Sequence, residues 1–195
     1  MSKEVNLDID GHNVRYFEEG TGKPVVILHG ASFSAEIWVK TGTMDAIAKS
    51  GWRPISVDMP GYGKTERNGY DTVASFLDRF FEKLGIEKAV IAGASLGGRE
   101  ALAFSIKYPQ RVIGLVLVGA VSVWMYEDML KSIKQLPALL IWGSEDNISP
   151  KENYQIIMKH LTNSRLAIIG KIHPCYLEEP LKFNNELSDF LKSIG

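Results

Sequence analysis

The amino-acid sequence predicts an α/β protein with a mostly parallel central sheet, helices on both faces and no separate cap domain. Two observations carry this prediction. Strand-like and helix-like segments alternate along most of the chain. The segments VVIL, VIGLVLV and ALLIW are nearly continuous apolar runs, which is typical of parallel strands that are covered on both faces. We expect residues 1–195 to form a single domain of this kind.

The first predicted elements are the two strands of an antiparallel hairpin. Residues 5–9 alternate between apolar and polar side chains, Asp10-Gly11 is a turn dipeptide, and residues 14–17 run back as a second strand. Each later strand is a short run rich in apolar and β-branched residues. These strands are predicted at 24–28, 53–57, 88–92, 112–118, 138–142 and 165–169.

Helices are predicted where apolar residues recur every three or four positions. The spacing is clear in 35–49, where Ile37, Met44 and Ile47 share one face. The complete set of predicted helices is 35–49, 72–84, 96–107, 123–134, 151–161 and 178–191. Only 19 residues, 119–137, separate two of the central strands, which is room for one crossover helix and no cap. We therefore expect an open site at the carboxyl ends of the strands, where ligands bind in such sheets.

The composition is that of an ordinary globular protein, with 45% hydrophobic and 23% charged residues. The formal charge of −1 argues against a nucleic-acid or membrane-surface partner, and nothing in the sequence indicates a protein partner. Cys175 is the single cysteine, which excludes an intrachain disulfide and suits a reducing compartment. Together with a polar N-terminus this predicts a cytoplasmic protein. The sequence holds no metal-ligand cluster, Walker loop or dinucleotide fingerprint, so we expect no metal and no other cofactor.

Ser95 lies at the centre of the pentapeptide GASLG, residues 93–97, between the apolar run 89–92 and the helix-like segment 96–107. A serine between small residues at a strand-to-helix junction is the nucleophile elbow of serine hydrolases. The turn is tight and brings the backbone close to neighbouring elements, so the flanking residues must be nearly without side chains. The alternative interpretation is a glycine-rich turn with an unreactive serine.

Two further strand ends carry an acid and a histidine, in the order in which the hydrolases with this elbow present them. Asp146 follows the strand 138–142 and lies 51 residues after Ser95. His173 follows the strand 165–169 and lies 27 residues after Asp146. We predict that Ser95 is the nucleophile, that His173 is the general base and then acid, and that Asp146 orients the imidazole.

Other residues compete for the last two roles. Glu145 adjoins Asp146, and Asp128 lies in another crossover where some hydrolases place their acid. Among the histidines, His29 also lies at a strand end, although Gly30 beside it favours a structural role. His12 and His160 have the surroundings of solvated surface residues. The short loop before Pro150 favours Asp146 over Glu145.

An oxyanion hole requires two N–H donors about 3 Å from the developing negative charge. We predict that the backbone N–H groups of Leu96 and Ala31 are these donors, and that Asp58 in the next motif has a structural role in a turn. Several apolar and aromatic residues near these loops are candidates for a substrate pocket: Phe33, Trp38, Trp124, Tyr126, Ile148 and Tyr176.

The motif series resembles that of the α/β-hydrolases, in order and over nearly the whole chain: HGAS at 29–32, DMPGYGKT at 58–65, GASLGG at 93–98, GSED at 143–146 and IHP at 172–174. Thr65 stands where that family more often has serine. The segments SFSAEIW and HPCYLEEP are similar to a small lidless branch, the ABHD14-type hydrolases that include CCG1-interacting factor B. The resemblance implies a catalytic triad at Ser95, Asp146 and His173. It also implies hydrolysis of small acyl esters, and one member of the branch is linked to moving acetyl groups from protein lysines to coenzyme A.

The predicted function is therefore hydrolysis of small-molecule carboxylic esters through an acyl-enzyme. Three alternatives remain open. The same acyl-enzyme would serve an acyltransferase or a protein-lysine deacetylase. The fold also serves as a slow ligand-binding or interaction module in some proteins. Finally, cofactor-free haloperoxidases and C–C bond hydrolases retain the serine, whereas a dehalogenase or epoxide hydrolase would need a carboxylate at position 95.

Overall fold

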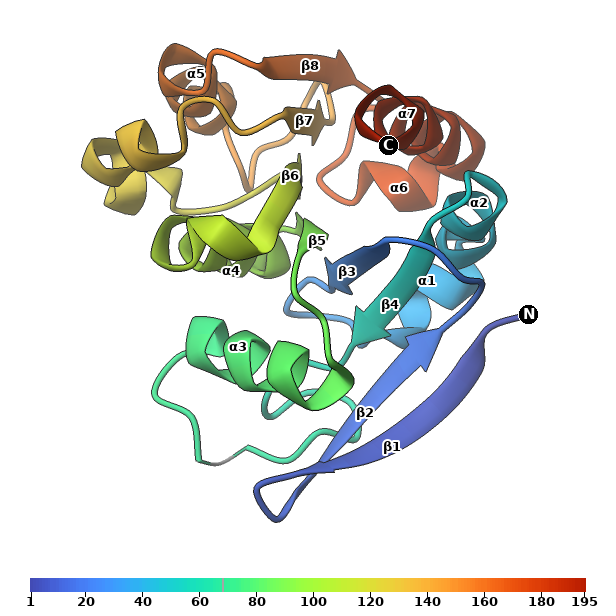
Figure 1. Ribbon diagram of the computed structural model, residues 1–195. Coiled ribbons are helices and arrows are strands. Elements are labelled where there is room, and N and C mark those ends of the chain that lie inside the picture. Colours follow the sequence, from blue (N-terminus) through green and yellow to red (C-terminus); the bar gives the residue numbers. More distant parts are fainter. Residues whose placement is uncertain (68) are drawn as a thin grey trace.

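The computed structural model describes residues 1–67 and 69–195. In these ranges an eight-stranded sheet runs through the molecule in the order β1-β2-β4-β3-β5-β6-β7-β8 (Figure 1). β1 and β2 form the antiparallel hairpin, β2 pairs antiparallel with β4, and all later pairs are parallel. The strands are β1 (Lys3–Ile9), β2 (His12–Glu18), β3 (Pro24–Leu28), β4 (Arg53–Val57), β5 (Ala89–Ala94), β6 (Val112–Val118), β7 (Ala138–Trp142) and β8 (Ser164–Ile168).

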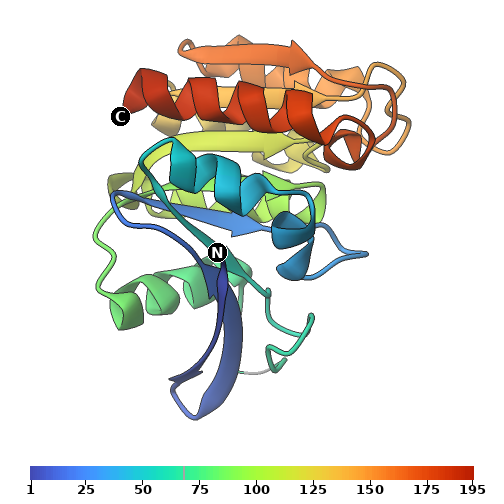
Figure 2. The same ribbon diagram turned by 90° about the vertical axis from the view of Figure 1, so that its right-hand side faces the viewer.

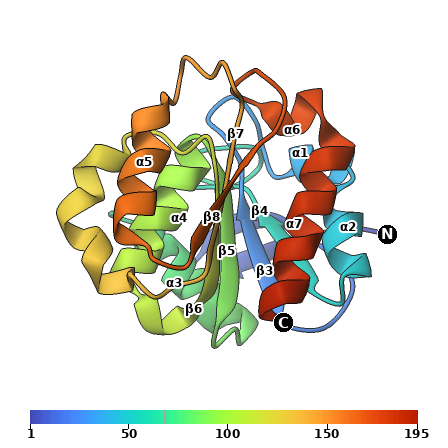
Figure 3. The same ribbon diagram turned by 90° about the horizontal axis from the view of Figure 1, so that it is seen from above.

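Helices cover both faces of this sheet, as the apolar strands predict. Seen from above, α3, α4, α5 and the 3₁₀ helix η2 lie on one side, and α1, α2, α6 and α7 lie on the other (Figure 3). The helices are α1 (Glu36–Lys40), α2 (Thr43–Lys49), α3 (Val73–Leu84), α4 (Leu96–Lys107), α5 (Lys151–His160), α6 (Cys175–Glu178) and α7 (Pro180–Ile194), with the 3₁₀ helices η1 (Pro109–Arg111) and η2 (Val123–Ile133). No helix within the described residues is both long and apolar enough to span a bilayer.

Strand residues alternate between two separate apolar cores. In β3, Val26 and Leu28 pack with α3 and α4, while Val25 and Ile27 pack with α2 and α7 on the opposite face. Successive side chains of a strand point to opposite faces, so a strand covered on both sides must be apolar at every position. This is the physical reason for the continuous apolar runs in the sequence. Figure 2 shows the resulting layers, with α7 and α2 in front of the sheet.

One predicted helix is divided in the structure, and another begins two residues later than predicted. The predicted helix 35–49 is two helices, α1 and α2, because Gly42 adopts a left-handed conformation with φ 71° between them. The predicted helix 178–191 is present as α7, which begins at Pro180 after Glu179 has left helical geometry at φ −131°. The short helix α6 just before it was not predicted. The predicted helix 123–134 is present as a 3₁₀ helix, η2.

The connection 119–137 contains η2 and no cap domain. η2 packs against α4 and α5 on one face of the sheet. It therefore covers part of the core instead of extending over the carboxyl ends of the strands. The fold class predicted from the sequence, including the lack of a cap, is confirmed for the described residues.

Asp58, directly after β4, joins three parts of the fold in the buried interior. Its carboxylate accepts hydrogen bonds from Arg15 Nε at 2.7 Å, from the backbone N–H of Ala35 at 2.7 Å and from that of Lys64 at 2.8 Å. Asp58 is fully buried, and Arg15 is only 6% exposed. The carboxylate thus holds the hairpin, the loop after β3 and its own loop together, in keeping with the structural role predicted for it.

We expect Asp58→Ala to lower the free energy of unfolding by about 3–5 kcal/mol, because it leaves the Arg15 guanidinium and two N–H groups buried without their acceptor. Glu36→Ala is the matched control, because it removes an exposed ion pair with Lys40 and should cost less than about 1 kcal/mol. Urea denaturation of both variants measures the difference. Equal losses would show that the Asp58 cluster is no more than a surface interaction.

Candidate active site

Ser95 sits in a strained turn at the carboxyl end of β5, directly before α4. Its backbone has φ 54° and ψ −114°, a conformation that non-glycine residues rarely adopt. The turn is held by hydrogen bonds at 2.8 Å from its N–H to the carbonyl of Val118 and at 3.1 Å from the N–H of Arg99 to its carbonyl. The backbone at Ser95 therefore has the tight strand-to-helix turn that the sequence predicts.

The small residues on each side of Ser95 are required by close backbone contacts. A Cβ atom at Gly93 would overlap the carbonyl oxygen of Gly97. A Cβ atom at Gly97 would lie 2.5 Å from the carbonyl oxygen of His29. Any side chain at either position would push α4 away from β3 and β5, and Ser95 with it.

His173 and Asp146 meet across the loops that follow β8 and β7. His173 Nδ1 lies 2.7 Å from Asp146 Oδ2, and the Asp146 side chain is 1% exposed. The other carboxylate oxygen of Asp146 accepts from the backbone N–H groups of Ile148 at 2.9 Å and Ser149 at 2.8 Å. Within the described residues His173 Nε2 is buried and has no hydrogen-bond partner. The outer ring nitrogen is thus available to a neighbouring hydroxyl or ligand.

Ser95 and His173 line the same cavity, of about 380 Å³. Ala31, one of the two predicted oxyanion donors, also lines it. The second predicted donor, Leu96, is the first residue of α4, so its N–H has no acceptor within the helix. The full lining is Gly30, Ala31, Ser32, Phe33, Ala94, Ser95, Val118, Ile148, His173, Pro174 and Tyr176.

Three of the six predicted pocket residues line this cavity: Phe33, Ile148 and Tyr176. Trp38 lies behind the wall, 4.7 Å from Tyr176 between ring centroids, and is buried in the core. Trp124 is 68% exposed on η2, and Tyr126 packs against the core beside it; neither lines the cavity. Both lie on the crossover, which turns away from the strand ends.

The competing acids lie on the surface. Glu145 forms an exposed ion pair with Lys171 at 3.3 Å. Asp128 is exposed on η2. Neither lines the Ser95 cavity, and the carboxylate that is hydrogen-bonded to His173 is that of Asp146. Of the candidate acids, the structure brings only Asp146 to the histidine.

His29 holds the loop after β3 in place. Its Nε2 accepts from the N–H of Met59 at 3.1 Å, so the ring proton is on Nδ1, which donates to the carbonyl of Gly30 at 2.8 Å. The ring is fully buried, and burial lowers the pKa of His29. Both ring nitrogens are occupied and the ring is neutral, so this histidine is not free to take a proton from Ser95.

Gly119 is a residue of the site that the sequence prediction missed. It has φ 52°, and a Cβ atom there would lie 3.0 Å from the His173 ring and 3.1 Å from Asp146 Oδ2. A side chain here would crowd the histidine–aspartate pair, and the positive φ also favours glycine. Its position just after β6, a strand next to the elbow, was the signal available in the sequence.

Cys175 lies in the same region but has the character of a core residue. It is fully buried, and burial raises the pKa of its thiol to about 12. Because the thiolate is the reactive form, this cysteine is a poor nucleophile. Among the described residues, no three histidine, cysteine or acidic side chains are grouped so that they could hold a metal ion.

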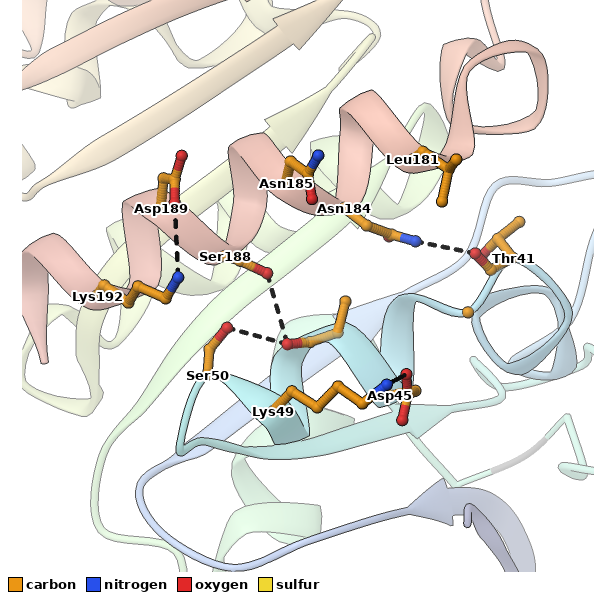
Figure 4. Close-up of a pocket in the computed structure, with 12 residues that line it drawn as sticks. Thr41, Asp45, Lys49, Ser50, Leu181, Asn184, Asn185, Ser188, Asp189 and Lys192 are labelled. Carbon is orange, nitrogen blue, oxygen red and sulfur yellow. Dashed lines mark hydrogen bonds and ion pairs between the residues drawn. The ribbon is translucent and has the colours of Figure 1, made fainter.

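A second cavity, of about 580 Å³, lies between α2 and α7 (Figure 4). Its polar groups bond to one another: Asn184 donates to the carbonyl of Thr41 at 3.0 Å, and Lys49 pairs with Asp45 at 2.7 Å. This groove shares no lining residue with the Ser95 cavity. It has no nucleophile–base arrangement, so the chemistry is sought at Ser95.

Comparison with known proteins bears on this site. The family model described as alpha/beta hydrolase fold matches residues 23–132, which is more than half of the chain. The chain belongs to the α/β-hydrolase fold family. The match covers three of the five motifs on which the sequence prediction was based, those at 29–32, 58–65 and 93–98.

Individual α/β-hydrolases resemble the chain over nearly its whole length. The putative protein-lysine deacylase ABHD14B of Pongo abelii is 28% identical and covers 98% of this chain and 96% of its own. A 2-hydroxy-6-oxononadienedioate/2-hydroxy-6-oxononatrienedioate hydrolase of Paraburkholderia phymatum is 40% identical, over 97% of this chain and 95% of its own. Some other relatives are longer, and the chain spans 64% of their length.

A solved structure agrees with the fold. The crystal structure of a predicted CIB-like hydrolase from Thermoplasma acidophilum has a TM-score of 0.93 and 27% identity, over 99% of both chains. Together these likenesses confirm the predicted resemblance to ABHD14-type α/β-hydrolases. They identify the protein as a member of a hydrolase family, without deciding its substrate.

Proposed function

We propose that this protein is a serine hydrolase of small carboxylic esters, in which Ser95, His173 and Asp146 form the catalytic triad. The observation that carries the proposal is the shared cavity. Ser95 and His173 both line it, and the far side of the His173 ring is hydrogen-bonded to buried Asp146 at 2.7 Å. A nucleophile, a base and a group that orients the base are the three parts that acyl transfer requires.

In the proposed mechanism the Ser95 hydroxyl attacks the ester carbonyl carbon while His173 Nε2 takes its proton. The N–H groups of Ala31 and Leu96 stabilise the negative oxygen of the tetrahedral intermediate. The intermediate collapses, the C–O bond to the alcohol breaks, and the alcohol leaves with the proton from Nε2. Water then attacks the acyl-enzyme with His173 again as base, which releases the acid and restores Ser95. Asp146 keeps the proton of His173 on Nδ1 throughout.

The cavity favours small, uncharged acyl groups. Its walls are mainly apolar, formed by Phe33, Val118, Ile148, Pro174 and Tyr176. Among the described residues that line it there is no lysine or arginine. A carboxylate in the acyl group would lose its hydration without gaining a partner. This weighs against a diacid substrate of the kind named for the Paraburkholderia relative, and so against C–C bond hydrolysis of such a compound.

A second candidate is deacylation of protein lysine, the activity in the name of the ABHD14B relative. The open site favours it, because the described residues form no cap over the cavity and Ile148 at its edge is 66% exposed. The same triad would attack the amide of an acyl-lysine. The two proposals are separated by assaying an acetyl-lysine peptide beside p-nitrophenyl acetate. For each compound, kcat/KM is divided by the rate constant of its uncatalysed hydrolysis, and the compound with the larger ratio is the better substrate.

We expect Ser95→Ala to reduce ester hydrolysis by about 10⁴- to 10⁶-fold while the protein stays folded, because the substitution removes only the nucleophilic oxygen. Fluorophosphonate labelling should be lost with it. The same melting temperature as the wild type controls for misfolding. More than a tenth of wild-type activity in this variant would contradict the assignment. A wild type that binds ester but is neither labelled nor active would point to a binding module.

Asp146→Asn should lower kcat by on the order of 10⁴-fold, because an amide would leave His173 in the wrong tautomer. Glu145→Gln and Asp128→Asn are matched controls, since each replaces an exposed carboxylate with the amide of the same length. Each should change kcat by less than about tenfold. The three variants are compared with one ester at one pH. A reversed ranking would transfer the role to the acid whose loss is large.

The selectivity for acyl length should peak at about two to four carbons and fall beyond roughly eight. Each CH₂ that a wall buries contributes about 0.8 kcal/mol, or nearly fourfold in kcat/KM, and without a cap there is little wall beyond the cavity. The measurement is kcat/KM for p-nitrophenyl esters from acetate to palmitate. A steady rise towards palmitate, with activation at lipid interfaces, would contradict the proposal.

A further inference from the structure

The loop that carries Asp146, residues 143–150, is itself held by a buried serine. Asp146 accepts from the backbone N–H of Ser149 at 2.8 Å, so the conformation at Ser149 determines where the carboxylate points. Ser149 is fully buried. Its carbonyl accepts from Trp142 Nε1 at 2.9 Å, which ties the loop back to the end of β7.

The hydroxyl of Ser149 makes two further bonds that leave the loop. Its Oγ donates to the carbonyl of Ala120 at 2.6 Å and accepts from Asn153 Nδ2 at 3.0 Å. Asn153, on α5, in turn accepts from the backbone N–H of Val123 at 3.2 Å. Both polar atoms of the Asn153 amide are thus used to bring the acid loop and the connection after β6 together.

That connection also holds the nucleophile. The carbonyl of Val118 accepts from the N–H of Ser95 at 2.8 Å, and the N–H of Val121 lies 3.4 Å from the carbonyl of Ser95. Gly119 lies against the His173–Asp146 pair. Residues 118–121 therefore bond to Ser95 and lie beside the His173–Asp146 pair, and the Ser149 hydroxyl connects them to the loop that carries Asp146.

We propose that Ser149 is a positioning residue, whose hydroxyl locks the Asp146 loop to residues 118–121 and so fixes the Asp146–His173 hydrogen bond relative to Ser95. The inference rests on the proposed serine hydrolase function for its kinetic consequence. Ser149 lies behind the carboxylate and does not line the cavity, so its effect should be on turnover and not on substrate binding.

Ser149→Ala removes the donor to Ala120 and the acceptor of Asn153 in a buried site, and the acid loop is then free to shift. Displacement of a catalytic group by about 1 Å costs on the order of 100-fold in rate. We therefore expect kcat, calculated per active site titrated with fluorophosphonate, to fall by about 10- to 100-fold. KM should change by less than about threefold. Ser105→Ala is the matched control, because it also deletes a buried hydroxyl, one that donates to the carbonyl of Ala101 within α4. It should leave kcat within about threefold of the wild type.

Proton NMR tests the same positioning role without any substrate. The His173 Nδ1 proton, in its short bond to Asp146, should resonate far downfield of ordinary amide protons. Ser149→Ala should move or broaden this resonance, Asp146→Asn should abolish it, and Ser105→Ala should leave it unchanged. If Ser149→Ala does not fold, Asn153→Ala is used in its place. It keeps Ser149 and Asp146, and it should shift the resonance in the same direction and reduce kcat by about three- to tenfold.

The outcomes separate the two proposals. A wild type that is not labelled by fluorophosphonate contradicts the proposed function, whereas the resonance still decides the role of Ser149. A Ser149→Ala variant with the wild-type resonance, and with kcat no lower than that of Ser105→Ala, overturns the positioning role. Loss of kcat together with an equal rise in KM would also overturn it, because that result would place Ser149 in substrate binding.

Discussion

The close approach of the first turn of α4 to β3 and β5 is the constraint on which the rest of the site depends. Because Gly97 has no side chain, the backbone of α4 can pack against the carbonyl of His29. Because Gly93 has none, the carbonyl of Gly97 fits beside β5. Ser95 is held between the two glycines at φ 54°, a conformation that costs on the order of 1–3 kcal/mol. Buried strands on both sides and the bond to Val118 offset that cost. A rigid sheet interior is thus what keeps a strained serine exposed to the cavity.

Two buried carboxylates in this fold are stabilised in different ways, and the difference matches the roles predicted for them. Asp58 has a cation partner, Arg15, at 2.7 Å, so the pair is neutral and serves only to join segments. Among the described residues Asp146 has no lysine or arginine partner, and its ion-pair contact is to His173. Its remaining lone pairs are satisfied by backbone N–H groups. Such donors stabilise a carboxylate without cancelling its charge, which in the proposed mechanism would stabilise an imidazolium at His173.

Strands and loops were predictable from the sequence to different degrees. The runs of β3, β6 and β7 are apolar at nearly every position, which is what burial on both faces demands, and their bounds agree with the prediction. The helix break at Gly42 was missed because the apolar period continues on both sides of it. Pro180 marks the start of α7, two residues after the predicted start. The meeting of Asp146 with His173 followed from strand ends at one edge of a sheet. Their catalytic roles stay a prediction.

The pocket was harder to predict because side-chain direction depends on tertiary contacts. Trp124 is close in sequence to a strand end, but η2 carries it outward, and it does not line the cavity. Gly119 and Ser149 were missed because nothing local marks a glycine or serine that acts through a partner far along the chain. Their contacts, to Asp146 across 27 residues and to Ala120 across 29, exist only once β6 and β7 lie side by side.

The short crossover after β6 has a consequence for how the site selects substrates. Its first residues connect the elbow to the loop that carries Asp146. The rest of the crossover packs as η2 against α4 and α5 and therefore provides no wall above the cavity. Selection is left to walls of unequal stiffness. Tyr176 is buried and backed by Trp38 and Phe183, with ring centroids 4.7 and 5.8 Å away, whereas Ile148 is 66% exposed on a loop. For the proposed ester substrates, the aromatic wall would therefore limit the size of the acyl group, and the Ile148 side is the one that could adapt to leaving groups of different size.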